Sequence, residues 1–362
     1  MKVRTSAAAF AALAAVLCCC LLPQSAFAEG GARDRVNAGT LLFPYFEVDL
    51  DDPDSNTVLS VRNSSATAML ANVTVWSDTG YPVLNFPMYF TGYDVVTFAL
   101  RAMLVEGELP VTASDGQDWT DTISPQGDRS QDINFASCNG ILPFQTPVLF
   151  PSTTQYLRDA LTGQPSEIAG GNCVGFDHGD TVARGYITVD AINSCTQLNP
   201  ASDNYFQTVT TFQNTFSGEY LWSGSGGRLV HSSAAVPIEA RGGWNPVEPA
   251  FVPGDYTFYG RYTGWDAVDQ REPLHGAWAV DMQARDAEVI VWRDTKDATP
   301  TPFACALGQP APMPLDDTAR IHFATDTAAS TAGGMGPFLA TQRMRLGDAA
   351  LGDAPGKPGW SY

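Results

Sequence analysis

The densest group of potential metal ligands in this 362-residue chain lies in an acidic loop near its N-terminal end. Five residues with side-chain oxygen atoms occur close together: Asp49, Asp51, Asp52, Asp54 and Asn56. Hard cations such as calcium are bound by several carboxylate and carbonyl oxygens of one loop. The loop is not an EF-hand, because Thr57 and Asn63 stand where that motif requires glycine and glutamate. The sequence predicts either a calcium site of another type or a solvated acidic turn.

A second candidate for binding chemistry is an aromatic segment that is predicted to be a strand, Tyr256–Trp265. Side chains alternate between the two faces of a strand, so one face is predicted to carry Tyr259, Arg261 and Trp265. If the other face is core, these residues form an exposed aromatic and cationic face that can stack on sugar rings or bind a protein. The competing interpretation is that Trp265 closes the end of a sandwich and Arg261 pairs with an acid.

Signatures of catalysis are weak. Hydrolysis of a polysaccharide by paired carboxylates needs two acids across a cleft. The second half of the chain offers Asp266, Asp269, Glu272 and Asp281, but their spacing does not define a separation. The segment Ser223–Gly227 lacks the first glycine of a nucleophile elbow, and the four histidines form no zinc-binding motif. The sequence therefore favours a protein that is not an enzyme, with a secreted polysaccharide-acting hydrolase as the alternative.

The N-terminus has the three parts of a secretory signal peptide. Lys2 and Arg4 form a basic region, Ala7–Leu22 is apolar, and small residues precede a cleavage site expected after Ala28. An uncleaved anchor is the alternative. No later apolar run reaches the length of a membrane-spanning helix, so we expect a secreted or periplasmic protein with no membrane span after cleavage.

The cysteines fit an oxidising compartment. Four of the seven follow the leader: Cys138, Cys173, Cys195 and Cys305. An even number in an exported chain predicts two disulfides, and three pairings are possible. We favour Cys138–Cys173 with Cys195–Cys305, because each bridge then stays within its own segment. The spacing matches no zinc motif, so neither a metal nor a redox role is expected for these cysteines.

The charge of the chain limits its partners. It contains 39 acidic and 20 basic residues, with a formal net charge of −19. Such a surface repels phosphate backbones and anionic lipid headgroups, so nucleic acid is not an expected partner. A protein or carbohydrate surface is the partner that this composition leaves open.

Short strands are the elements that must position these residues. Four β-rich apolar runs between residues 56 and 100 are bounded by turn residues, which predicts consecutive antiparallel strands of a sandwich. Leu41–Leu50 precedes them and is expected to be an edge strand, because Pro44 cannot donate to a ladder. One helix is predicted from Pro151 to Gly163, where proline begins and glycine ends the apolar periodicity.

Changes in composition predict five segments. They are a signal peptide (1–28), an N-terminal β-sandwich (38–112), a loop and helical insertion stapled by a disulfide (113–180), a C-terminal β-sandwich (181–325) and a flexible tail (326–362). The sequence Val73–Thr79 is echoed at Val289–Thr295, which indicates either two related domains or a chance similarity between two strands. The expected fold class is mainly β, with two Ig-like sandwiches and the helical insertion between them.

The order of several sequence blocks resembles a group of exported bacterial proteins of unknown function. The blocks include FPYFEVDL, VTVWSDTG, TISPQGDRSQDINFASC and ARGYITVD, and the resemblance extends over most of the mature chain. It implies export and a common fold, and it supplies no catalytic residue or cofactor. We therefore expect a non-catalytic secreted or cell-envelope protein that acts in structure or binding. A hydrolase and a calcium-stabilised adhesion module are the alternatives, and calcium is the one cofactor considered.

Overall fold

The computed structural model of this chain describes its central part and several shorter segments nearer the C-terminus. The described residues are 36–111, 148–202, 205, 209–211, 213–238, 277–279, 288–292, 301–305, 339–345 and 358–360. This part of the chain is mainly β, with antiparallel sheets and few helices, as the sequence predicts. The predicted signal peptide lies outside the described residues.

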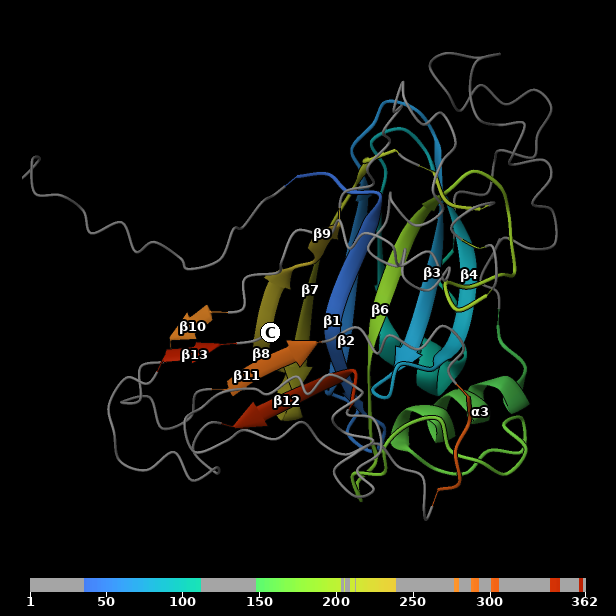
Figure 1. Cartoon of the computed structure of the whole chain (residues 1–362), viewed down its shortest axis with the longest axis vertical. Helices are drawn as coiled ribbons and strands as arrows, with labels where there is room; N and C mark the ends of the chain where they lie inside the picture. Colours follow the sequence, from blue (N-terminus) through green and yellow to red (C-terminus); the bar gives the residue numbers. More distant parts are fainter. Residues whose placement is uncertain are drawn as a thin grey trace, which may run out of the picture. The chain divides into compact units, whose positions relative to one another are not determined.

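Two antiparallel sheets contain the first nine strands (Figure 1). The strands are β1 Thr40–Asp49, β2 Asn56–Asn63, β3 Met69–Ser77, β4 Pro82–Phe90, β5 Val95–Ala99, β6 Val182–Ile192, β7 Phe216–Gly224, β8 Arg228–Ala234 and β9 Val236–Ile238. The five-stranded sheet has the order β4-β3-β6-β1-β9, and the four-stranded sheet has the order β5-β2-β7-β8. The predicted strands between residues 56 and 100 are thus present, with β3 and β4 in the five-stranded sheet and β2 and β5 in the four-stranded sheet.

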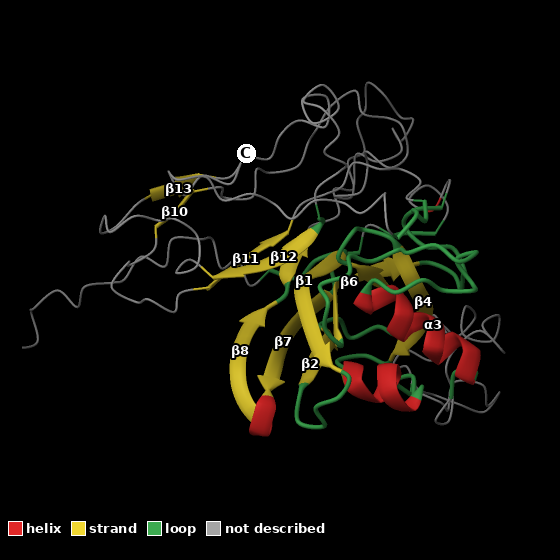
Figure 2. Ribbon diagram, turned by 90° about the horizontal axis from the view of Figure 1, so that it is seen from below, coloured by secondary structure: helices red, strands yellow, loops and turns green. Residues whose placement is uncertain are grey.

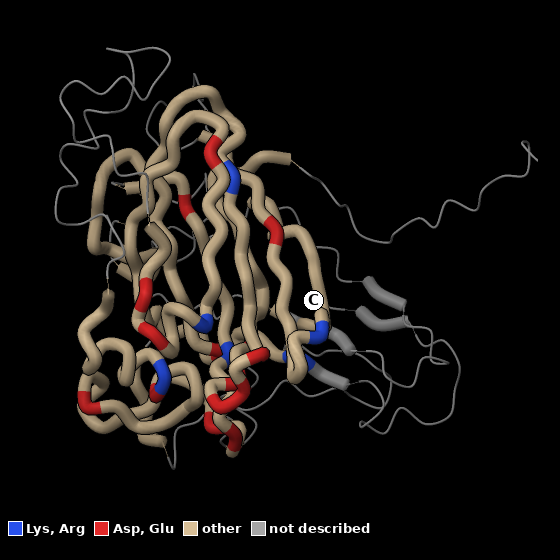
Figure 3. Tube along the Cα trace, turned by 180° about the vertical axis from the view of Figure 1, so that it is seen from behind, with Lys and Arg blue, Asp and Glu red and all other residues tan. Residues whose placement is uncertain are grey.

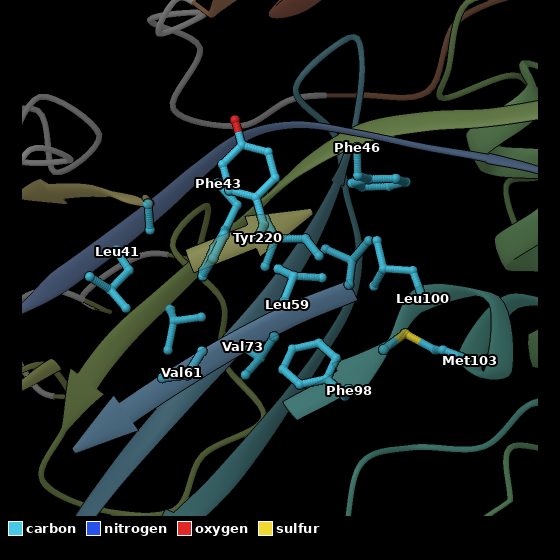
Figure 4. Close-up of a cluster of buried hydrophobic side chains, with 14 of the residues drawn as sticks. Leu41, Phe43, Phe46, Leu59, Val61, Val73, Phe98, Leu100, Met103 and Tyr220 are labelled. Carbon is cyan, nitrogen blue, oxygen red and sulfur yellow. The ribbon is translucent and has the colours of Figure 1, made fainter. Parts of the chain in front are cut away.

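The hydrophobic core lies between these two sheets. Because alternate side chains of a strand point to one face, each strand contributes every second residue to the core. Leu41 and Phe43 of β1 meet Leu59 and Val61 of β2 and Tyr220 of β7 in one buried cluster (Figure 4). No described disulfide joins these strands to one another, so the buried faces supply much of their stability, at about 1.5–3 kcal/mol for each large apolar side chain.

The division into two sandwiches at 38–112 and 181–325 is not confirmed. Strand β6 lies between β3 and β1 in the five-stranded sheet, and β7 pairs with β2 along its whole length in the other. Strands of both predicted domains therefore build one pair of sheets. Composition changes along the chain could not show this, because hydrogen bonding between distant strands decides which of them are neighbours.

Strand β1 is not the edge strand that Pro44 suggested. It pairs with β6 over most of its length and with β9 at Thr40–Leu42. Its register with β6 shifts between Phe43 and Phe46, which places Pro44 at an irregularity in the ladder. A bulge of this kind tolerates the missing N–H of proline inside a sheet.

Helix α3, Pro151–Thr162, confirms the predicted helix (Figure 2). It begins at a proline and ends at Gly163, whose φ of 73° is left-handed. Leu157, Ala160 and Leu161 are buried on the face that packs beside β6 and β4. A short π-helix, η1 Ala102–Glu106, follows β5, and a 3-10 turn, η4 Ser225–Gly227, connects β7 to β8.

Two short strand pairs come from the C-terminal part of the chain. Strand β11 Glu288–Trp292 pairs with β12 Thr341–Arg345, and β10 Ala277–Ala279 pairs with β13 Pro358–Trp360. Both β12 and β13 fall within the segment 326–362 that was expected to be a flexible tail. Each pairs with a strand that lies at least 49 positions earlier in the sequence, β12 with β11 and β13 with β10.

The two similar sequences Val73–Thr79 and Val289–Thr295 each contribute a tryptophan to the same aromatic cluster. Trp76 of β3 stacks on Tyr186 of β6, with ring centroids 5.5 Å apart. Trp292 of β11 meets the same Tyr186 ring edge-on at 5.7 Å. The two tryptophans of the echo therefore contribute to one aromatic cluster on the face of the five-stranded sheet that is turned away from the core.

Candidate functional site

A pocket lies between strands β1, β7, β8 and β11, beside the edge strand β8. Its volume is about 470 Å³. The described lining residues are Pro44, Tyr220, Trp222, Val230, His231, Ser233 and Ile290. The volume lies within the range of about 300–1,000 Å³ that is usual for small-molecule sites. Four strands, β1, β7, β8 and β11, thus supply the walls.

Three stacked rings form one wall of this pocket. Tyr220 and Trp222 are two residues apart on β7 and share its inward face, and Trp222 is paired with His231 of β8. The His231 ring stacks on the Trp222 indole with centroids 4.4 Å apart and an angle of 27° between the planes. The centroids of Tyr220 and Trp222 are 6.2 Å apart. The period of two along the strands therefore produces a continuous aromatic wall.

Register irregularity shapes the mouth of the pocket. Trp222 pairs with His231 and Ser223 pairs with Leu229, so Val230 is an additional residue in β8. A bulge of this type changes the direction of a side chain. It turns Val230 toward the pocket, where it lies in the lining while remaining 45% exposed.

The described lining of the pocket carries no permanent charge. Partial burial lowers the pKa of His231 through desolvation, which favours the neutral imidazole at pH 7. Burial likewise raises the pKa of Tyr220, which keeps its hydroxyl protonated. In a chain with a net charge of −19, this wall is a neutral and largely aromatic surface.

No assembled nucleophile is found among the described residues that line the pocket. The Ser233 hydroxyl and the His231 imidazole both line it. However, Nε2 of His231 and Nε1 of Trp222 are buried without a hydrogen-bond partner among the described residues. An activated serine needs a hydrogen bond to its base, and the base needs a third group to orient it. Neither contact is present in the described part of this site.

The acidic loop predicted as a calcium site is organised around a guanidinium group. Nη1 of Arg101 donates to the carbonyl oxygens of Asp49 at 2.7 Å and Asp52 at 2.6 Å. The backbone N–H of Arg101 donates to Oδ1 of Asn56 at 3.1 Å. Carbonyl oxygens that would face a calcium ion thus face a cation of the protein itself.

The carboxylates of the same loop serve other bonds. Asp49 Oδ1 accepts the backbone N–H of Asp51, and Asp52 Oδ1 accepts that of Asp54. Across the described residues, no three acidic, histidine or cysteine side chains are grouped as metal ligands. In the described structure, Arg101 and backbone N–H groups thus bind several of the oxygen atoms of this loop.

The disulfide pairing that we favoured from the sequence is wrong. Cys173 is bonded to Cys305, with a Cα–Cα distance of 5.0 Å. Cys195 is also disulfide-bonded. The Cys173–Cys305 bridge reinforces an antiparallel contact in which Cys173 and Phe303 exchange two backbone hydrogen bonds, both 2.9 Å long. The bridge joins the segment that follows helix α3 to a residue 132 positions later in the chain.

The other predicted site residues cannot be placed. Tyr259, Arg261 and Trp265 lie outside the described residues, as do the four acids of the hydrolase hypothesis. Of the four histidines, His178 and His231 are described. His231 joins the pocket, which the sequence did not indicate because its aromatic partners are contributed by another strand.

His178 forms a side-chain hydrogen bond with Asp78 that the sequence also did not reveal. The Nε2 atom of His178 lies 2.9 Å from Oδ2 of Asp78, which is almost fully buried. The other carboxylate oxygen accepts the backbone N–H of Phe176 at 2.9 Å. The backbone oxygen of Asp78 accepts two further N–H groups, from Ala340 and Thr341. Asp78 therefore fastens two distant segments to the turn after β3, one through its carboxylate and one through its backbone oxygen.

A buried polar network lies on the face of the five-stranded sheet that is turned away from the core. Oδ1 of Asp190 accepts a 2.6 Å hydrogen bond from Thr40, and Oδ2 accepts one of 3.0 Å from the Tyr205 hydroxyl. Asn72 in turn donates to the Tyr205 hydroxyl at 3.0 Å. Complete burial raises the pKa of Asp190 to about 6, although both hydroxyl donors oppose this shift. The network holds Tyr205 against β1, β3 and β6.

Comparisons of this chain with protein-family models, with curated proteins and with solved structures found no match. Within the described residues, the structure contains no helix that is both long enough and apolar enough to cross a membrane.

Proposed function

We propose that this chain is a non-catalytic exported protein, secreted or in the cell envelope, that binds a small uncharged ligand. The observation that carries the proposal is the neutral aromatic pocket between β8, β7, β1 and β11. Export is supported by the form of the N-terminus and by the Cys173–Cys305 disulfide, since disulfides persist in oxidising compartments.

The pocket supports an uncharged ligand for two electrostatic reasons. Its described walls offer no carboxylate, lysine or arginine to neutralise an ionic group. The excess of acidic residues in the chain repels anions at longer range, within a Debye length of about 8 Å at physiological salt. A ligand with a flat apolar face, such as a neutral sugar ring or an aromatic ring, matches the stacked wall of Tyr220, Trp222 and His231.

The proposal is tested by ligand titration of a variant with a filled pocket. Ser233 is exposed on an edge strand, so Ser233→Phe fills the pocket without disturbing the core. A panel of neutral mono- and disaccharides, neutral aromatic compounds and one sugar acid is screened by saturation-transfer NMR. We expect a neutral compound to bind, the sugar acid to bind at least tenfold more weakly, and Ser233→Phe to abolish binding.

Ser232→Phe is the matched control. It makes the same change one residue earlier, on the opposite face of β8, and should leave ligand binding unchanged. Binding that survives in Ser233→Phe, or a panel in which no neutral compound binds, would count against the proposal. The hydrolase and adhesion alternatives rest on residues outside the described chain and on the acidic loop, and neither draws support from the pocket.

A further inference from the structure

The face of the four-stranded sheet that is turned away from the core has an unusual composition for this chain. The register of β5, β2, β7 and β8 shows which residues are neighbours on this face. They form three rows. The first contains Ala99, Val58, Leu221 and Ser232, the second Thr97, Ser60, Glu219 and Ala234, and the third Val95, Arg62 and Ser217. We call these eleven residues the outer face.

The outer face has no net charge. Glu219 and Arg62 are its two charged residues, one of each sign, whereas the chain as a whole carries a net charge of −19. Figure 3 views the molecule from this side, and few acidic or basic positions interrupt the long strands. Repulsion between two copies of so acidic a protein is therefore smallest when these faces meet.

Shape and exposure also suit the face to contact with another sheet. Small and β-branched side chains predominate on it. Val95 and Leu221 are 52% and 40% exposed, although both are apolar. Such a surface resembles the inner faces of sandwiches, which pack at about 10 Å from one another.

We propose that the outer face binds the outer face of a second copy of this chain, in an isologous dimer. The two charges make the face self-complementary. A two-fold axis in the plane of the interface, midway between Arg62 and Glu219, brings each of these residues beside the opposite charge of the other copy. One axis thus forms two equivalent ion pairs, while Val58, Leu221 and Val95 supply the apolar contact.

The size of the outer face sets the expected affinity. Eleven residues on each side are fewer than the roughly 20–30 of a standard stable interface. We therefore expect a weak dimer with a dissociation constant on the order of micromolar. This inference is independent of the pocket, because His231 and Ser233 point to the other side of β8.

Sedimentation equilibrium of the mature chain at 0.15 M salt, over loading concentrations from about 1 to 300 μM, tests the proposal by measuring the dissociation constant. We expect a monomer–dimer equilibrium. Leu221→Asp should raise the dissociation constant at least tenfold, because each copy places a carboxylate in the apolar contact. Arg62→Glu and Glu219→Arg should each raise it by about threefold to tenfold, because each creates two like-charge contacts.

The variant in which both charges are exchanged is the decisive test. Arg62→Glu combined with Glu219→Arg restores both ion pairs and should return the dissociation constant to within threefold of the unmodified chain. Glu167→Arg changes the net charge as Glu219→Arg does, at an exposed position outside this face, and should have no comparable effect. Thermal unfolding followed by circular dichroism checks that each variant is folded. The proposal would be overturned if the chain stayed monomeric at all concentrations. It would also be overturned if these substitutions left the dissociation constant of the dimer unchanged.

Discussion

Asp190 shows how one residue couples burial to the pH dependence of stability. Its carboxyl group is completely buried and accepts hydrogen bonds from Thr40 and Tyr205, yet its pKa is raised to about 6 because desolvation outweighs these bonds. The folded protein therefore takes up this proton more readily than the unfolded chain, in which the pKa of aspartate is about 3.9. The resulting stabilisation is complete below pH 4 and is lost as the pH rises from 4 through 6.

The substitution Asp190→Asn tests this coupling. Between pH 4 and pH 7 the native carboxyl group should lower the free energy of unfolding by about 3 kcal/mol, from a pKa difference of about two units. Asparagine does not ionise, so the variant should lack this component. Urea unfolding at several pH values measures the difference between the two proteins. Asp51→Asn, at an exposed position, is the control and should retain the pH profile of the unmodified chain.

Arg101 illustrates a contact of the acidic loop that composition at single positions does not reveal. Five oxygen-bearing side chains in one loop indicated calcium, and the sequence could not show that the loop's carbonyl oxygens point to an arginine about 50 positions later. A guanidinium group satisfies carbonyl oxygens with several N–H donors in fixed directions. A loop with the same oxygen atoms can therefore bind either a metal ion or an arginine side chain, and its sequence does not distinguish the two.

Helix α3 is the element whose beginning and end were best predicted, and its C-terminal glycine has a second role. Gly163 has a φ of 73°, which disfavours any residue with a Cβ atom. A Cβ atom at this position would also overlap the backbone of Phe176 and Asp177. The glycine thus both ends the helix and allows the following loop to return across it.

The substitution Gly163→Ala separates these two roles when it is compared with Gly171→Ala. Gly171 also has a positive φ, of 81°, but a Cβ atom there meets no neighbour within 4 Å. We expect Gly171→Ala to cost about 1 kcal/mol of unfolding free energy from backbone strain alone. Gly163→Ala should cost at least twice as much, because the loop must move. Chemical denaturation measures both, and equal losses would show that the overlap relaxes freely.

At the scale of the whole molecule, the order of strands makes the two halves of the chain interdependent. Strand β6 contributes hydrogen bonds to both β1 and β3, and β7 closes the core over β1 and β2. A fragment of residues 38–112 retains β1 to β5 but loses both partners. Its apolar faces would then be exposed to water.

We expect this fragment to be unfolded in isolation. Its amide NMR spectrum should show the narrow dispersion of a disordered chain, and urea should produce no cooperative transition. The chain of residues 29–362, with its disulfides oxidised, is the control and should unfold cooperatively. A fragment with dispersed resonances and a sigmoidal unfolding curve would restore the prediction of an independent N-terminal domain.

The sequence by itself determined the local structure. Alternating apolar residues and turn chemistry located β1 to β5 to within a few residues, and proline and glycine located α3, because these signals act over one strand or one helical turn. Tertiary structure alone decided which strands pair and that Cys173 bonds Cys305. It also decided that the Arg101 side chain binds the carbonyl oxygens of the acidic loop and that His231 stacks on Trp222. Each of these contacts joins residues that are distant in the chain or on different strands. Their free energy depends on the assembled core, and local sequence preference does not contain that information.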